Sequence, residues 1–144
     1  KESPAHFKAS LTKVFKPSAA MALGSAIHCK VLEPKLFLKH YAIMPKIFKD
    51  KRAKGYKEWH ENYGVGKTVI DDATHNKICE CTESVLSEPD VSSYFRGGKA
   101  EHVGIATDDE TGIRMKIRMD NYHQMAKVIV DLKTTGKNVA TYCC

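Results

Sequence analysis

Apolar side chains in the first half of the chain recur at helical spacing. Between residues 18 and 33 an apolar residue returns at every fourth position, as Leu23, Ile27 and Val31. This interval places the three on one face and predicts a helix with a single buried stripe. Pro34 is expected to end that helix, because a proline ring cannot continue the backbone hydrogen bonding.

Three further segments are predicted as helices. A short one over residues 4–13 has Ser3 as its cap and a proline at its first position. Residues 48–60 form a basic stretch with a helical pattern, and residues 41–44 before it are predicted to be extended. The third helix starts at Asp71 or Asp72, runs to about residue 87 and is followed by Pro89. Its inward positions are expected to be Ile78, Val85 and Leu86.

After Gly97-Gly98 the pattern changes to alternation with period two, which is typical of strands. Three strands are predicted, over residues 101–107, 113–121 and 127–133, and the first two are joined by a hairpin turn at residues 108–112. The second strand turns an apolar face toward the predicted core: Ile113, Met115, Ile117 and Met119. The third, Val128-Ile129-Val130, is apolar on both faces, as in a central strand covered on both sides.

Helices followed by a run of strands indicate an α/β fold in its α+β variant, a mixed sheet flanked by helices. The length of 144 residues predicts one domain over residues 1–144. The chain opens without an initiator methionine, so we expect a piece trimmed relative to its natural protein. No apolar run approaches the roughly 20 residues that cross a bilayer, so no membrane-spanning segment is expected.

The net charge of +6 favours an acidic partner such as nucleic acid, an anionic membrane or an acidic protein. Charge alone does not choose between them, and a basic surface without a polyanion partner is the plain alternative. Five cysteines without regular spacing argue against a disulfide framework and favour a reducing, cytoplasmic location. They are Cys29, Cys79, Cys81, Cys143 and Cys144. His75 and Cys79 share a helix face, but a structural zinc site needs a second pair.

The strongest candidate chemistry lies at the ends of the second and third strands. Asp120 closes the cationic face of one strand, and Asp131 and Lys133 share a face of the next. If these strands pair antiparallel, the two carboxylates lie side by side. Adjacent carboxylates repel each other unless a cation joins them, and hard oxygen ligands suit Mg²⁺ or Mn²⁺. A plain ion pair between aspartate and lysine at a strand end is the alternative.

Two other residues are candidates for the same site. Glu101 opens the first strand, where it is either a further metal ligand or a solvated strand end. His28 lies one turn after Gly24, which is small enough to let another segment approach closely. A lone helical histidine is more often a packing residue than a ligand. Gly64-Val65-Gly66-Lys67-Thr68 is rejected as a phosphate-binding loop, because that motif needs an earlier glycine where Glu61 stands.

The candidate residues fall within a series of sequence blocks. The helix block Gly24–Pro34 spaces glycine, histidine and Leu-Glu-Pro four residues apart. Further blocks follow along the chain, namely Lys51–Gly55, Gly66–Ile70, Glu110–Ile113, Arg118–Asp120 and Asp131–Thr135. In composition and order the six blocks resemble those of the RecE-type exonucleases (exonuclease VIII). One such block is weakly specific, but six in register are strongly so.

The resemblance implies the PD-(D/E)XK restriction-endonuclease-like core and Mg²⁺-dependent, 5′-to-3′ digestion of linear double-stranded DNA. It implies that His28, Asp120 and Asp131 hold the metal, that Lys133 assists the water, and that Glu101 fills an acidic position before the first strand. The products would be 3′ single strands for recombination in a phage or prophage setting. A catalytically impaired remnant that binds DNA or metal is the alternative function.

The resemblance also suggests partners. DNA ends and a single-strand annealing recombinase are implied, as is a ring-shaped homo-oligomer of four chains. The family continues past its lysine into a further helix, which Thr141-Tyr142-Cys143-Cys144 does not resemble. Cationic residues in two regions are candidate phosphate contacts whose binding should weaken with salt. They are Lys51, Arg52 and Lys54 in the basic stretch, and Arg114, Lys116 and Arg118 in the second strand.

Overall fold

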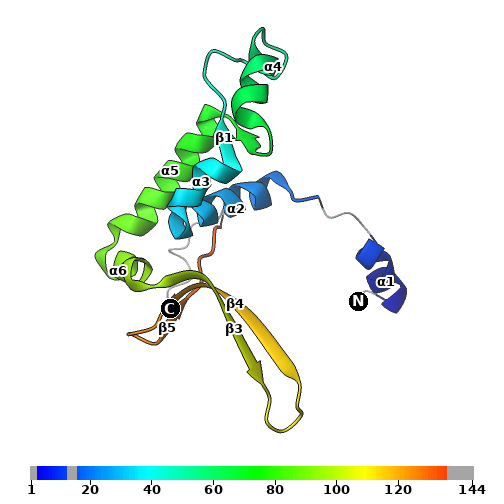
Figure 1. Cartoon of the computed structure of the whole chain (residues 1–144), viewed down its shortest axis with the longest axis vertical. Coiled ribbons are helices and arrows are strands. Elements are labelled where there is room, and N and C mark those ends of the chain that lie inside the picture. Colours follow the sequence, from blue (N-terminus) through cyan, green and yellow to red (C-terminus); the bar gives the residue numbers. More distant parts are fainter. Residues whose placement is uncertain (1–2, 13–15, 136–144) are drawn as a thin grey trace.

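The computed structural model describes residues 3–12 and 16–135. Figure 1 shows a helical body from which a long β-hairpin projects, with the N-terminal helix lying apart from both. The helices are α1 (Pro4–Thr12), α2 (Ala19–Leu32), α3 (Pro34–His40), α4 (Tyr56–Trp59), α5 (Asp72–Ser87) and α6 (Pro89–Gly97). A π-helical turn, His60–Gly64, follows α4. The strands are β1 (Tyr41–Ile43), β2 (Thr68–Ile70), β3 (Lys99–Thr107), β4 (Arg114–His123) and β5 (Val128–Val130).

The core lies where α2 packs against α5. The predicted stripe is confirmed: Ile27 and Val31 are buried, and Leu23 packs against them. Ile78 on α5 is fully buried, with Val85 beside the same cluster. Leu86 was predicted to face inward, and this is wrong: it is exposed. At 100° per residue Val85 lies about 20° from Ile78 around the helix axis but Leu86 about 80°, at the edge of the buried face.

The two long helices begin within one or two residues of the predicted starts. The Ser18 hydroxyl accepts a hydrogen bond from the Met21 amide at 3.3 Å, and the Asp71 carboxylate accepts one from Thr74 at 2.8 Å. The short helices α3 and α6 were not predicted. Pro34 and Pro89 occupy their first turns, so each proline ends one helix and also starts the next.

The basic segment is not the helix that was predicted over residues 48–60. Helical structure begins only at Tyr56, after turns that include Gly55 with a φ of 86°. A carboxylate at Asp50 accepts the Arg52 amide at 2.7 Å and fixes one of these turns. The helical periodicity there came from aromatic side chains that pack on one another across the turns, such as Phe48 and Tyr56.

A small parallel sheet pairs β1 with β2. The extended stretch over residues 41–44 is thus confirmed, whereas β2 was missed. It follows the glycine-rich segment that was rejected as a phosphate loop. There the Lys67 ammonium donates to the Leu38 carbonyl oxygen at 2.8 Å, a packing role rather than a nucleotide contact.

The second sheet is antiparallel, in the order β3-β4-β5. Its centre is therefore β4, which corrects the prediction that the third strand is central and covered on both sides. Strand β5 ends at Val130 instead of reaching residue 133, and Ile129 is 54% exposed. The hairpin turn over residues 108–112 is confirmed: the Asp108 amide donates to the Ile113 carbonyl oxygen at 2.9 Å.

The apolar face of β4 is core only at its inner end. Met119 is buried, but the outer residues of that face are exposed, namely Ile113, Met115 and Ile117. The prediction of a fully buried face fails because β3 and β4 extend well beyond the helices (Figure 1). The inner end is anchored by Asn121, which is almost fully buried and donates to the Tyr94 carbonyl oxygen of α6 at 2.8 Å.

Candidate active site

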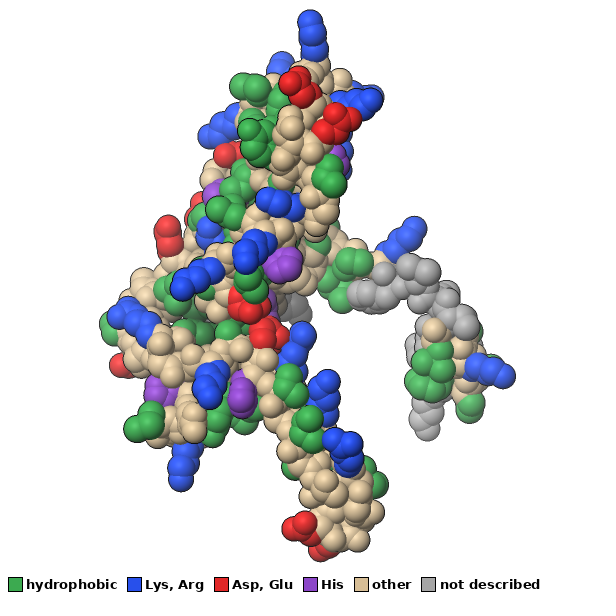
Figure 2. Space-filling view, viewed as in Figure 1, with side chains coloured by type: hydrophobic (Ala, Val, Ile, Leu, Met, Phe, Trp, Pro, Cys, Tyr) green, Lys and Arg blue, Asp and Glu red, His purple; other side chains and the backbone are tan. Residues whose placement is uncertain are grey.

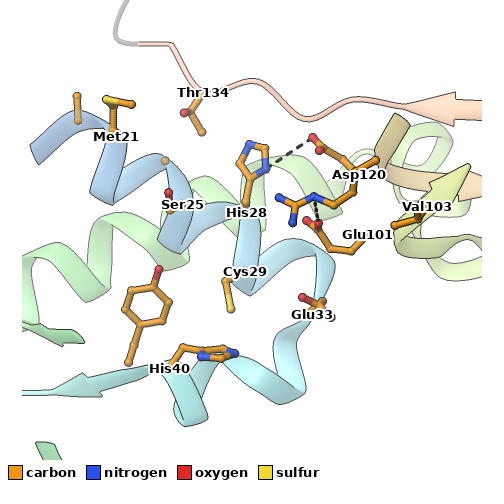
Figure 3. Close-up of a pocket in the computed structure, with 14 residues that line it drawn as sticks. Met21, Ser25, His28, Cys29, Glu33, His40, Glu101, Val103, Asp120 and Thr134 are labelled. Atoms are coloured by element: carbon orange, nitrogen blue, oxygen red, sulfur yellow. Dashed lines mark ion pairs between the residues drawn. The ribbon is translucent and has the colours of Figure 1, made fainter. Parts of the chain in front are cut away.

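A cavity of about 1030 Å³ opens between α2 and the inner end of the hairpin. Helix α2 contributes His28 and Cys29, and the hairpin contributes Glu101, Arg118 and Asp120 (Figure 3). Residues separated by almost the whole chain thus meet at one place. Three of the five residues that were predicted as catalytic line this cavity: His28, Glu101 and Asp120.

Asp120 is the residue that connects these elements. One oxygen of its carboxylate, Oδ2, lies 3.6 Å from His28 Nδ1 and also accepts the Leu132 amide at 2.8 Å. The Asp120 side chain is 20% exposed and that of His28 27% exposed. A carboxylate that is largely removed from water needs such partners, because burial otherwise penalises its charge. Both side chains remain open enough to reach a ligand in the cavity.

Glu101 faces Asp120 across the two strands of the hairpin. The flanking pairs, Ala100 with Asn121 and His102 with Met119, place the two acids opposite each other, although no pairing joins them. Glu101 has a φ of 51°, a conformation that L residues other than glycine seldom adopt. Its carboxylate binds Arg118 Nε at 2.9 Å (dashed in Figure 3). Strained backbone of this kind is concentrated at functional sites.

Asp131 and Lys133 lie just beyond β5, on the segment that passes the cavity. They share a face, as predicted, and Leu132 between them points into the core. The Lys133 ammonium binds both Asp131 oxygens, at 3.0 and 2.8 Å. Neither residue lines the cavity, and the Asp131 side chain is 56% exposed. The extended register places Asp131 opposite Asp120, and the Asp131 carboxylate pairs with Lys133. Direct juxtaposition of the Asp120 and Asp131 carboxylates stays a prediction.

The electrostatics of Lys133 keep it charged. Its hydrogen bond and ionic contact with Asp131 raise the pKa of the ammonium, and the charge of Asp120 acts in the same direction. Asp120 therefore lies within electrostatic reach of the lysine. A protonated lysine at this position can stabilise negative charge that develops on a nearby phosphate.

The donors around the cavity have the chemistry that a divalent cation needs. Carboxylate oxygens suit Mg²⁺ or Mn²⁺, and an imidazole nitrogen suits the latter. Within residues 3–12 and 16–135, no three His, Cys, Asp or Glu side chains already converge as a metal-binding group. Two of the acids are held in ion pairs instead, Glu101 by Arg118 and Asp131 by Lys133. The residue types fit a cation, which would replace these internal pairings.

Gly24 allows the segment after β5 to approach α2 closely. A Cβ at this position would lie 2.9 Å from Thr134 Oγ1. The prediction that Gly24 allows a close approach is therefore confirmed, and the approaching segment is the one that carries Asp131 and Lys133. Thr134 also lines the cavity, a role that sequence reasoning did not identify. Neither the Arg118–Glu101 pair nor the cavity position of Cys29 was foreseen.

The other cationic candidates lie elsewhere. Lys51, Arg52 and Lys54 belong to the turns before α4 and do not line the cavity. Figure 2 shows that lysine and arginine side chains gather around α4 at one end of the molecule, and others follow the hairpin at the opposite end. Arg114 and Lys116 are exposed on the hairpin.

Comparison with known proteins identifies the family. The family described as "PDDEXK-like domain of unknown function (DUF3799)" matches residues 1–142. The chain belongs to this PDDEXK-like family. No curated protein is similar enough to the chain to count as a relative.

The PDDEXK-like assignment confirms the predicted superfamily and fold class, with helices beside a parallel pair of strands and an antiparallel sheet. It supports a nuclease, and so a hydrolase. Asp120 lies in β4, and Asp131 and Lys133 follow β5, the strand that pairs with β4. None of the helices over the described ranges has both the length and the apolar character needed to cross a membrane. Cys29, Cys79 and Cys81 are free thiols, and Cys143 and Cys144 lie outside the described residues.

Proposed function

We propose that this PDDEXK-like protein is a metal-dependent exodeoxyribonuclease that hydrolyses phosphodiester bonds of linear double-stranded DNA. The observation that carries the proposal is the meeting of His28, Glu101 and Asp120 in one cavity, with the Asp131–Lys133 segment bonded to Asp120 through the Leu132 amide. The resemblance to RecE-type exonucleases supports the finer points. These are 5′-to-3′ polarity, Mg²⁺ as the cofactor, and 3′ single strands as products for an annealing recombinase.

The proposed roles follow from the residue chemistry. His28, Asp120 and Asp131 would hold the cation, and Glu101 is placed to support them. A divalent cation supplies Lewis-acid polarisation of a phosphate oxygen and neutralises its charge. Lys133 lies two residues after Asp131, so its ammonium would stabilise charge on the phosphate or orient the attacking water.

The test is degradation of end-labelled linear duplex in Mg²⁺ or Mn²⁺, with wild type compared with Asp120→Asn, Asp131→Asn and Lys133→Met. Asn at position 120 retains an oxygen that accepts the Leu132 amide, so loss of activity would not reflect a lost anchor. We expect each variant to lose roughly 100-fold or more in rate, the range found when one charge-stabilising group is removed.

Glu83→Gln is the matched control, because Glu83 is an exposed carboxylate on α5, outside the cavity and away from the hairpin. It should retain wild-type activity. Labelling of the 5′ or 3′ end separates the two polarities. A wild type that binds DNA and never cuts it would support the alternative, a binding remnant whose acids stay locked by Arg118 and Lys133.

A further inference from the structure

The projecting hairpin has two chemically different faces. On one face, three cations of β4 each lie opposite an uncharged side chain of β3. The pairs are Val103 with Arg118, Ile105 with Lys116 and Thr107 with Arg114. Residues paired across strands share a face, so the three cations form a row beside a row of uncharged side chains. The other face carries Met115 and Ile117.

The cationic face continues into the active-site cavity. Arg118 and Val103 line the cavity, and Asp120 is the next residue of β4 on the same face. Successive cations are about 6.8 Å apart at the rise of an antiparallel strand, or roughly two nucleotides of axial rise along one DNA strand. From Asp120 to Arg114 the distance is about 20 Å, or roughly six nucleotides.

The outer end of the hairpin has the opposite charge. The turn carries three acids, Asp108, Asp109 and Glu110, and Figure 2 shows them beyond the lysine and arginine side chains of the arm. Hydrogen bonds from Thr111 lower the pKa of Asp108, so this carboxylate stays ionised. An acidic tip repels a polyanion, so the attractive region extends from Arg114 inward and ends at the cavity.

We propose that this face of the hairpin, Arg114, Lys116 and Arg118, is a track that holds the phosphate backbone of one DNA strand and leads it to the cavity. The proposal rests on the proposed nuclease function, because it names the surface that feeds that site. The evenly spaced cations fit the evenly spaced phosphates of a DNA strand. The cluster of acids at the inner end of the row would hold the cation at which the scissile phosphate binds. The carboxylates of Glu101 and Asp120 at the end of this face would repel an acidic protein.

Arg118 differs from the other two cations. It is bound to Glu101, so a phosphate at the inner end would compete with that carboxylate for the guanidinium. Arg114 and Lys116 are exposed and have no ion pair within the described ranges, so a phosphate would not compete with an internal carboxylate for them. They are therefore the residues to change, because their loss leaves the cavity intact.

The experiment measures binding of a labelled blunt duplex by fluorescence polarisation, with EDTA present so that no cutting occurs, at several salt concentrations. The double variant Arg114→Gln/Lys116→Gln is compared with wild type and with Lys35→Gln/Lys77→Gln, which removes two exposed charges from the helical body. Each lost phosphate contact lowers the slope of log affinity against log salt by about 1, so the hairpin variant should lose about 2. The body variant should keep the wild-type slope.

A second variant tests the acidic boundary. Asp109→Asn/Glu110→Gln removes two repelling charges and should bind the duplex more tightly than wild type, the opposite change to the cation variant. Unchanged slope in Arg114→Gln/Lys116→Gln would overturn the track. Equal weakening of poly-glutamate binding would instead assign the face to acidic proteins.

Degradation in Mg²⁺, measured separately, distinguishes this result from that of the nuclease proposal. If the hairpin variant binds DNA with a reduced salt slope but the wild type does not cut, the track proposal stands and the nuclease proposal fails. If the wild type cuts but the hairpin variant keeps the wild-type salt slope, the nuclease proposal stands and the track proposal fails.

Discussion

Cys29 shows how the charges of the cavity act on a single side chain. Partial burial raises the pKa of its thiol from the ordinary 9.0, and the nearby carboxylates of Glu33 and Glu101 raise it further. Each of these effects disfavours the thiolate, which is the reactive form. At neutral pH the thiol next to His28 is therefore predominantly protonated.

Alkylation of Cys29 should accordingly need alkaline solution. The rate with iodoacetamide, followed by peptide mapping to separate Cys29 from the other thiols, should reach half its maximum above pH 9.0. Glu33→Gln removes one source of the shift and should move the profile to lower pH, without restoring 9.0 because burial remains. Coincident profiles for Cys29 in wild type and Glu33→Gln would contradict this account of the thiol.

At the scale of elements, the start of α5 depends on one carboxylate. Hydrogen bonds from Thr74 lower the pKa of Asp71 from the ordinary 3.8. A depressed pKa means that the folded state binds the proton more weakly than the unfolded state. The stabilisation is therefore fully present above pH 3.8 and is lost as pH falls through the lower, folded value.

Asp71→Ala should cost about 1 kcal/mol of unfolding free energy at pH 7, the usual effect of losing an N-cap. Urea denaturation should show this difference shrinking in acid. Asp71→Asn retains the cap without the charge, so it should remain near wild type at pH 7 and lack the acid-dependent loss that belongs to Asp71. An equal loss in the Ala and Asn variants would mean that the charge, rather than the hydrogen bond, starts the helix.

Elements with a capping residue and a long apolar period could be predicted from the sequence, as for α2 and α5. Several elements of three to nine residues could not, among them α3, α6 and β2. Pro34 and Pro89 each fit two descriptions, the end of one helix or the first turn of another, and only tertiary packing chooses between them. Likewise, alternation in β4 identified a strand but not how far the body would cover it, so Met115 and Ile117 were wrongly placed in the core.

The sequence predicted where the backbone places the site residues better than it predicted the directions of their side chains. Antiparallel pairing of β4 and β5 brings Asp120 opposite Asp131, as the alternation indicated. The direction of each side chain depends on partners that sequence order does not reveal. Asp131 pairs with Lys133 and does not line the cavity, and Arg118 binds Glu101. The cavity itself joins α2 to a hairpin that is remote in sequence, a contact that only the folded chain defines.

At the scale of the whole molecule, the body and the hairpin differ in what they contribute to stability. Ile78 is fully buried between α2 and α5, whereas Ile117 is 54% exposed on the arm. Ile78→Ala should lower the unfolding free energy by about 2–5 kcal/mol, because it leaves a cavity in the core. Ile117→Ala should cost less than about 1 kcal/mol, the scale of strand propensity at exposed positions. Similar losses in urea denaturation would show that the arm is packed in solution.

The Asp120 carboxylate has two roles. It accepts the hydrogen bond from the Leu132 amide, which fixes the segment after β5 beside the cavity, and it faces the proposed cation. An ancestor that lost catalysis by replacing this acid with a small apolar residue would also free the stretch around Leu132. Descendants that have given up cutting would therefore still be selected to keep an acceptor here. An aspartate or asparagine at position 120 is accordingly a poor guide to whether a relative remains active. A lysine at position 133 is the better guide.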